Sequence, residues 1–209
     1  MEFKQAVRRR RMTRHFSPQP VAFEVLRRIV EAATRGPSAG FAQGHRFVVI
    51  TDAEMRKRVA DAGGEPAFVE REFEPWLSGA PAHIVVCVDE GEYRARYARG
   101  DKRSSMSPEE WPVPYWFVDA GAALMLILLA AVDEGLSAGF AGVHSFVGLH
   151  ELLGIPAGVT PIGVVTIGYP APTPARRSPA RRRQPASRVI FWNRWGDPLP
   201  EEIFGGSAD

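Results

Sequence analysis

The sequence lacks the features that several large protein classes require. It has one cysteine, Cys87, so no disulfide can form within the chain, which is typical of a reducing compartment. Its longest apolar run, 120–132, is shorter than the roughly 20 residues of a membrane helix, so we expect a buried helix there. Residues 1–7 lack the apolar segment of a signal peptide. We therefore expect a cytoplasmic protein without a membrane partner.

A strong charge excess, a metal-ligand pattern and a nucleophile motif are also lacking. The formal net charge is only +2, which argues against a dedicated nucleic-acid-binding protein. His144 and His150 are too widely spaced to share a helical face as paired metal ligands do. No GxGxxG or phosphate-loop pattern occurs, and Ser, Cys and His are not arranged in any recognisable nucleophile set. Without a protein nucleophile or a metal, the chemistry of an enzyme of this kind has to come from an organic cofactor.

Arginine, in contrast, is abundant and falls into two clusters. Five arginines lie within residues 8–14, and a second group lies at positions 176, 177 and 181–183. A guanidinium keeps its charge and donates two parallel hydrogen bonds, which suits phosphate. Either the two clusters converge on one anion in the folded protein, or they form two solvated surfaces. The small net charge favours a focused anion site.

The hydrophobic pattern predicts an α+β domain, because helices and strands are mixed without a strict βαβ rhythm. The strand over 82–89 is apolar at nearly every position, and so we expect it in the centre of its sheet. The helix over 119–136 is apolar on nearly every side and has to be covered, either by its own domain or by another subunit. We expect further helices over 2–10, 21–34, 52–62, 68–77 and 145–153, strands over 45–51, 161–169 and 189–195, and a short strand or glycine-rich turn over 137–142.

Three other stretches have no regular period: 37–44, 90–117 and the Pro/Arg-rich stretch 170–187. The loop 37–44 is rich in small residues, which let the backbone approach a ligand closely. Residues 90–117 hold several aromatic side chains that are costly to leave in water, so we predict a lid, with disorder as the alternative. We therefore treat 1–209 as a single domain, with 90–117 as a lid-like insertion and 170–209 as a C-terminal extension.

Six stretches, taken in order, resemble the nitroreductase family of FMN enzymes. They are RRRMTRHFSPQPV (9–21), AATRGPSAGFAQGHRFVVIT (32–51), DAGAALMLILLAAVDEGL (119–136), ELLGIP (151–156), VVTIGYP (164–170) and VIFWNRWG (189–196). Each is weak alone, but their order and spacing are specific, and the resemblance covers nearly all of residues 5–196. The sequence WPVPYWFVDAGAA also resembles a mycobacterial or actinobacterial branch. The resemblance implies a central, mainly antiparallel sheet flanked by helices, in an intertwined homodimer with one FMN at each of two subunit interfaces.

By this resemblance the FMN site draws on four segments of the chain. An N-terminal stretch lies near the phosphate and the pyrimidine side of the flavin, and a loop, typically from the partner subunit, lines the ring. A third segment presents a backbone N–H to the reactive nitrogen, and a C-terminal basic pair closes on the phosphate. In that order, the predicted cofactor-binding residues are Arg10, Arg11, Met12 and Arg14; Pro37, Ser38, Ala39, Gly40 and Gln43; Ala141, Gly142 and Val143; and Arg181 and Arg183.

The sequence departs from the family at several positions. Phe41 stands where the family commonly has Asn, Gly44-His45 stands where it has Pro-Trp, and Arg188 replaces a usual acidic position. These departures bear on the hydrogen bonds to the ring and on the substrate pocket, and not on the phosphate site. Phe41, Trp111 and Tyr115 are the predicted substrate contacts.

We therefore predict an FMN-dependent oxidoreductase that takes hydride from NADH or NADPH and reduces an electron-poor aromatic acceptor, such as a nitroaromatic or a quinone. No catalytic side chain and no metal are predicted, because flavin N5 carries the chemistry. The expected partners are a second copy of the chain and a small-molecule acceptor, with no nucleic acid. One alternative is another flavin reaction in the family, such as reductive dehalogenation or reduction of an unsaturated cofactor precursor. The other is a non-catalytic binder of flavin or nucleic acid.

Overall fold

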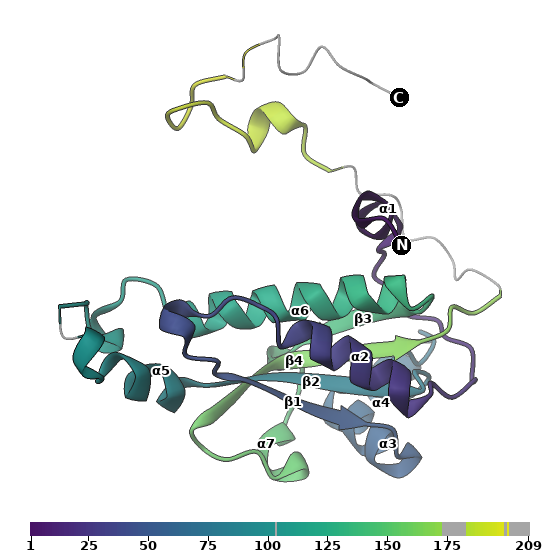
Figure 1. The fold of residues 1–209 in the computed structure, drawn as a ribbon. Coiled ribbons are helices and arrows are strands. Elements are labelled where there is room, and N and C mark those ends of the chain that lie inside the picture. Colours follow the sequence, from purple (N-terminus) through teal and green to yellow (C-terminus); the bar gives the residue numbers. More distant parts are fainter. Residues whose placement is uncertain (103, 173–182, 199, 201–209) are drawn as a thin grey trace. The chain divides into compact units, whose positions relative to one another are not determined.

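The computed structural model describes residues 1–102, 104–172, 183–198 and 200 (Figure 1). The chain divides into two compact units, Met1–Ala175 and Arg176–Asp209. Of the elements that the structure describes, the first unit carries every α-helix and every strand. Each unit is described by itself below.

The first unit is built on a four-stranded antiparallel sheet with the strand order β1-β2-β4-β3. The strands are β1 (His45–Ile50), β2 (Ala82–Asp89), β3 (Ser137–Gly142) and β4 (Val159–Gly168). β2 lies between β1 and β4, and Val85 pairs with Val48 on one side and Val164 on the other. All its residues but the last are buried, which confirms the central position predicted from its apolar sequence. β3 lies at one edge of the sheet.

Within the described residues, seven α-helices accompany the sheet. They are α1 (Phe3–Arg9), α2 (Phe23–Ala33), α3 (Ala53–Ala62), α4 (Glu65–Val69), α5 (Glu90–Tyr97), α6 (Tyr115–Asp133) and α7 (Leu149–Leu153). Leu26, Ile29 and Ala33 place the buried face of α2 at the predicted helical spacing. Asp52 is the N-cap of α3, because its carboxylate accepts the N–H of Met55 at 2.8 Å.

Helices cover both faces of the sheet. Figure 1 shows α2 and α6 over one face and α3 and α7 over the other. Alternate residues of β2 point to the two sides: Ile84 and Val86 pack with α2 and α6, whereas Val85 and Cys87 pack with α3 and α7. The α+β class, with an antiparallel sheet flanked by helices, is therefore confirmed.

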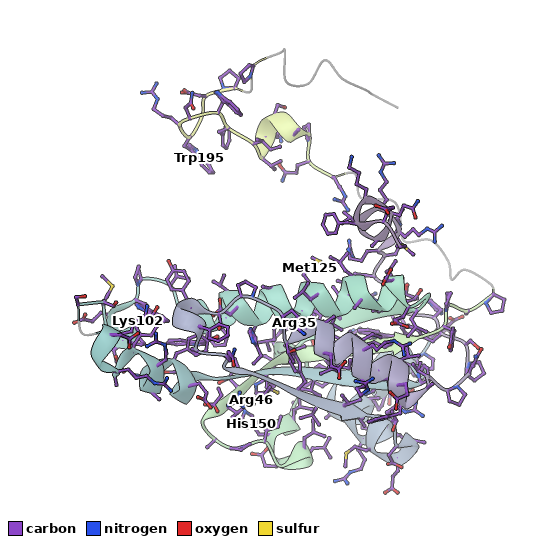
Figure 2. All side chains as sticks on the ribbon, in the orientation of Figure 1. Arg35, Arg46, Lys102, Met125, His150 and Trp195 are labelled. Atoms are coloured by element: carbon purple, nitrogen blue, oxygen red, sulfur yellow. The ribbon has the colours of Figure 1, made fainter. Side chains whose placement is uncertain are left out.

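Helix α6 is the longest element, and it is covered on one side by the rest of its unit. Ala123 and Ile127 are fully buried against the sheet and α2, and Ala120 is fully buried in a cluster with Val88 and Tyr93. On another side, Val118 is 52% exposed and Met125 is 46% exposed, and Figure 2 shows Met125 projecting away from the sheet. By length and composition alone, α6 could cross a membrane, a test that core helices of soluble proteins also pass. Its packing identifies it as a core helix with one apolar side left open.

Three predicted helix boundaries are wrong. Residues 68–77 do not form a helix: α4 begins earlier, after Gly64 in the left-handed conformation and with Pro66 in its first turn, and it ends at Val69. Helix α6 begins at Tyr115 and not at Asp119. Helix α7 begins at Leu149, because Gly148 precedes it with a φ of 70° and interrupts any helix that starts at Ser145.

The stretch 90–117 contains structure that the sequence did not reveal. Asp89 is the N-cap of α5 through the N–H of Gly91 (3.1 Å). Two 3-10 turns follow, at Gly100–Lys102 and Pro108–Glu110. The lid function of this stretch stays a prediction. In the second unit, the predicted strand at 189–195 is wrong, since these residues form turns after the 3-10 turn Ala186–Arg188.

Candidate functional site

The arginine segment 10–14 leaves α1 and runs beside the outer edge of β3. Met12 forms a parallel bridge with Ala138, and the N–H of Thr13 donates to the carbonyl oxygen of Ala138 at 2.9 Å. Gly139 makes this approach possible, because a Cβ at that position would lie 2.4 Å from the carbonyl oxygen of Thr13. The sheet edge therefore fixes the backbone from which the side chains of residues 10–14 project.

The arginines of this segment have no carboxylate partner within the part of the chain that the structure describes. None of Arg10, Arg11 and Arg14 forms an ion pair there. Arg11 donates to the carbonyl oxygen of Arg10 at 3.0 Å, and Arg14 lies over the ring of Trp76, 5.2 Å from its centroid. Three positive charges on a fixed backbone are thus available to an anion.

The third predicted segment lies on the same strand. Ala141 and Gly142 end β3, and Val143 begins the 3-10 turn Val143–Ser145. Gly142 pairs with Gly163 of β4. At about 3.3 Å per residue, Val143 is roughly 16 Å along the chain from Ala138, where the arginine segment is attached. The structure therefore brings the first and third predicted segments onto one edge of the sheet.

The loop 37–43 has an unusual backbone. It contains the 3-10 turn Ala39–Phe41, and three of its residues are left-handed: Gly40 (φ 61°), Phe41 (φ 60°) and Gln43 (φ 55°). Glycine adopts this conformation freely, whereas Phe and Gln do so at a cost. The N–H of Gln43 donates to the hydroxyl of Ser38 at 2.9 Å. The rest of the protein therefore has to hold the loop in this shape.

Two side chains outside the loop bond to it, and a third bonds to one of these two. The carboxylate of Asp119, on α6, accepts the N–H of Ala39 at 2.8 Å and the hydroxyl of Tyr93 at 2.8 Å, both on one oxygen. Arg96 of α5 donates to the carbonyl oxygen of Gly40 at 2.7 Å. Burial, together with the bond to Asp119, raises the pKa of Tyr93 above its ordinary value, so the hydroxyl stays protonated and donates.

Sequence reasoning missed this role of Asp119. The sequence predicted a helix that begins at Asp119, but α6 already begins at Tyr115, and Asp119 is only 7% exposed. A single carboxylate within an otherwise apolar run was the available signal, because a buried carboxylate needs hydrogen-bond partners.

The loop and the arginine segment lie at opposite ends of α6 within one chain. The loop is bound to Asp119 near the start of the helix, and the arginine segment joins β3 at Ala138, shortly after the helix ends at Asp133. Asp119 and Asp133 are about 21 Å apart along the helix axis, and Figure 1 shows the loop and α1 near opposite ends of α6. One chain therefore does not bring all the predicted segments together.

The three predicted substrate residues differ in exposure. Trp111 is partly buried at the centre of an aromatic cluster, with its ring centroid 4.9 Å from that of Tyr97, 5.4 Å from Tyr115 and 5.8 Å from Trp116. Tyr115 is 42% exposed and Phe41 is 76% exposed. Trp111 thus packs mainly against protein, whereas Tyr115 and Phe41 present apolar surface. Their contact with a substrate stays a prediction.

The C-terminal basic pair is not placed with the other segments. Arg181 lies outside the residues that the structure describes, and Arg183 belongs to the second unit. Within that unit, the rings of Phe191 and Trp195 pack at 4.6 Å, and Trp195 is 89% exposed. The expectation that the pair closes on a phosphate stays a prediction.

Comparisons with known proteins agree on the family. The nitroreductase family model matches residues 7–169. A relative from Archaeoglobus fulgidus is 34% identical over 165 residues, which cover 77% of this chain and 81% of the relative. The FMN reductase (NAD(P)H) of Bacillus subtilis is 31% identical over 175 residues, 80% of this chain and 65% of the relative. The solved structure of the hypothetical oxidoreductase YcnD from Bacillus subtilis is 28% identical, with a TM-score of 0.72 over 97% of this chain and 77% of that one. These relatives do not support the mycobacterial or actinobacterial branch.

Proposed function

This chain belongs to the nitroreductase family, and from that membership we propose that it is a cytoplasmic, homodimeric, FMN-dependent NAD(P)H oxidoreductase. Its acceptor is a flat, electron-poor small molecule such as a nitroaromatic or a quinone. The relatives whose names include FMN reductase, NADPH-flavin oxidoreductase and NADPH nitroreductase support the cofactor and the electron donor. Bound FMN supplies the electron-carrying chemistry between the nicotinamide and the acceptor.

The observation that carries this proposal is the set of arginines on the edge of β3. FMN bears a phosphate, and the reduced flavin gains negative charge on its pyrimidine side. Arg10 and Arg11 offer charge-assisted hydrogen bonds to the phosphate, and Arg14 offers a fixed cation to the ring. The residues Ala141–Val143, on the same strand, offer backbone groups to the ring. The donor set of this edge therefore fits the cofactor.

A homodimer accounts for the two features that one chain leaves incomplete. The open side of α6, with Val118 and Met125, is apolar and half exposed, and burying such a surface favours association. The loop 37–43 lies too far along α6 to reach the arginine segment of its own chain. We propose that this loop lines the flavin held by the arginines of the partner subunit.

Exposed aromatic side chains support a flat acceptor. Phe41 extends from the loop, and Tyr115 packs against Trp111 while keeping part of its own surface exposed. Flat aromatic ligands stack on such rings. In a dimer built as proposed, Phe41 and Tyr115 would border the acceptor's place above the flavin.

The proposal is tested by cofactor content and by one pair of matched variants. Purified protein should release FMN when it is denatured, and Arg10→Ala should weaken FMN affinity by roughly 1.5–3 kcal/mol, as for a lost charged hydrogen bond. Arg9→Ala is the control, because Arg9 is exposed in the last turn of α1 and should change the affinity little. Protein that is colourless, releases no FMN and gains none when FMN is added would overturn the proposal.

A further inference from the structure

The segment 74–80, which leads from α4 to β2, contacts Arg14 of the arginine segment and His15, the residue that follows it. The ring of Trp76 lies beneath the Arg14 guanidinium, 5.2 Å from ring centroid to Cζ. The carboxylate of Glu74 lies 2.7 Å from Nδ1 of His15. The Trp76 ring also reaches β3, since a Cβ built on Gly139 would lie 3.2 Å from its Cζ3 atom. Trp76 is therefore placed between the sheet edge and the side chain of Arg14.

A buried carboxylate fixes the backbone of this segment. Glu65, the first residue of α4, is only 5% exposed. One of its oxygens accepts the N–H of Trp76 and the N–H of Leu77, both at 2.6 Å, and the other accepts the N–H of Ser78 at 3.2 Å. A carboxylate is costly to bury unless it is hydrogen-bonded. The Glu65 carboxylate accepts hydrogen bonds from three successive backbone N–H groups, so it fixes the orientation of the backbone at Trp76.

Two further side chains bond to carbonyl oxygens of the same segment. Burial lowers the pKa of His83 to about 4, so its ring is neutral near pH 7, and Nε2 donates to the carbonyl oxygen of Leu77 at 2.8 Å. Arg56 donates to the carbonyl oxygen of Ala80 at 2.6 Å. Residues of α3, α4 and β2 thus hold the backbone of 76–80 in one conformation.

We propose that Trp76 is a positioning residue for the flavin site: its ring holds the Arg14 guanidinium in place for FMN, and Glu65 holds Trp76. An aromatic face attracts a guanidinium without neutralising its charge, unlike a carboxylate, so Arg14 is fixed and still available to an anion. Arg14 is the arginine of the segment that lies over an aromatic ring in the described chain. This inference rests on the proposed function, because Arg14 has this role only if the chain binds FMN.

The alternative role of Trp76 is packing between segment 74–80 and β3, and a double-mutant cycle on the full-length protein separates the two. The variants are Trp76→Leu, Arg14→Gln and the double variant, with Trp76→Phe as a variant that keeps an aromatic face. The measurements are the Kd for FMN and the reduction potential of the bound flavin. Circular dichroism and the elution volume of each variant show that it remains folded and assembled.

If Trp76 acts through Arg14, Trp76→Leu weakens FMN binding by about 3- to 10-fold and makes the reduction potential more negative. Trp76→Phe retains most of the affinity. In the Arg14→Gln background, Trp76→Leu changes neither quantity further, because the cation that it positions is gone. If Trp76→Leu does not fold, Trp76→Phe is compared in the same two backgrounds and should show the same coupling at a smaller size.

Three results would overturn the inference while leaving the proposed function intact. Trp76→Leu weakens FMN binding by the same factor in both backgrounds, or leaves it unchanged in the wild type, or Arg14→Gln itself leaves FMN binding unchanged. If the wild-type protein binds no FMN, the proposed function is wrong, and this result comes from the wild type alone and not from the double-mutant cycle. The two failures are therefore distinguishable in one set of measurements.

Discussion

The arginine segment 10–14 and the loop 37–43 are held in place in opposite ways. The segment lies extended along β3, where Thr13 bonds to Ala138 through the backbone, and its arginine side chains remain unpaired with carboxylates in the described chain. The loop bonds to side chains, among them Asp119 and Arg96, and two of its non-glycine residues are left-handed. In the arginine segment the backbone is fixed and the arginine side chains remain available to an anion. In the loop, side chains fix a backbone that would otherwise relax.

This difference indicates how each region fails. A left-handed non-glycine residue costs of the order of 1–3 kcal/mol and persists only where its surroundings impose it. The loop should therefore depend on single side chains, and above all on Asp119. The arginine segment carries no such strain, but it requires the space that Gly139 leaves. Removing a carboxylate should damage the loop, and adding a methyl group should damage the sheet edge.

The largest effect is expected from Asp119→Ala. This change removes two hydrogen bonds to a buried carboxylate and leaves the Ala39 N–H and the Tyr93 hydroxyl unpaired. Because bonds to charged groups are worth about 1.5–3 kcal/mol each, we expect the free energy of unfolding in urea to fall by about 3–5 kcal/mol. Hydrogen exchange should accelerate in the loop and not at Thr13.

The matched control is Asp133→Ala, at the other end of α6. Asp133 is 52% exposed and pairs with the terminal amino group, so its removal should cost less than about 1 kcal/mol. Equal losses in the two variants, or faster exchange at Thr13 after Asp119→Ala, would show that the two regions are not held independently.

A smaller effect is expected from Gly139→Ala. The new methyl carbon would lie 2.4 Å from the carbonyl oxygen of Thr13 and 2.8 Å from Oγ1 of Thr166, and the backbone of the segment has to move. Overpacking of this kind costs about 1–3 kcal/mol. FMN affinity should fall as well, since the arginines move with their backbone, and titration of the apoprotein with FMN measures it. Gly158→Ala is the control, because a Cβ at Gly158 would meet no atom within 4 Å, and its FMN affinity should be unchanged. An unchanged FMN affinity in Gly139→Ala would show that the contact between the arginine segment and β3 does not position the arginines for FMN.

The sequence was most informative where burial imposes a pattern. β2 is buried on both faces and is therefore continuously apolar, and α2 shows its buried stripe at helical spacing. Helix α5 was missed because Tyr93 is its single buried residue, so it has no apolar period. Its available signals were the N-cap Asp89 and the spacing of Glu90 and Arg94, which form an ion pair.

Only part of the site was predicted, because only features local in the sequence could be recognised. A local run of arginine shows which residues are charged, and the resemblance indicates which segments matter. Neither shows that Asp119 reaches the loop or that Trp76 lies under Arg14, because these contacts join residues far apart in sequence. The positions of buried polar partners follow from the packed fold, which a single sequence does not display residue by residue.

The smallest expected effect tests the strain itself, and its sign is opposite to the others. Phe41→Asn replaces a left-handed Phe by the residue that the family resemblance places there, and Asn adopts this conformation more readily. Phe41 is 76% exposed, so little buried surface is lost within the chain, and we expect the free energy of unfolding in urea to rise by about 0.5–1 kcal/mol.

Phe73→Asn is the control, because Phe73 is 61% exposed and is not among the left-handed residues. If both variants change stability equally, the loop is not strained at Phe41. A gain at Phe41 alone, accompanied by weaker binding of flat acceptors, would show that the loop tolerates its strain in order to present this ring.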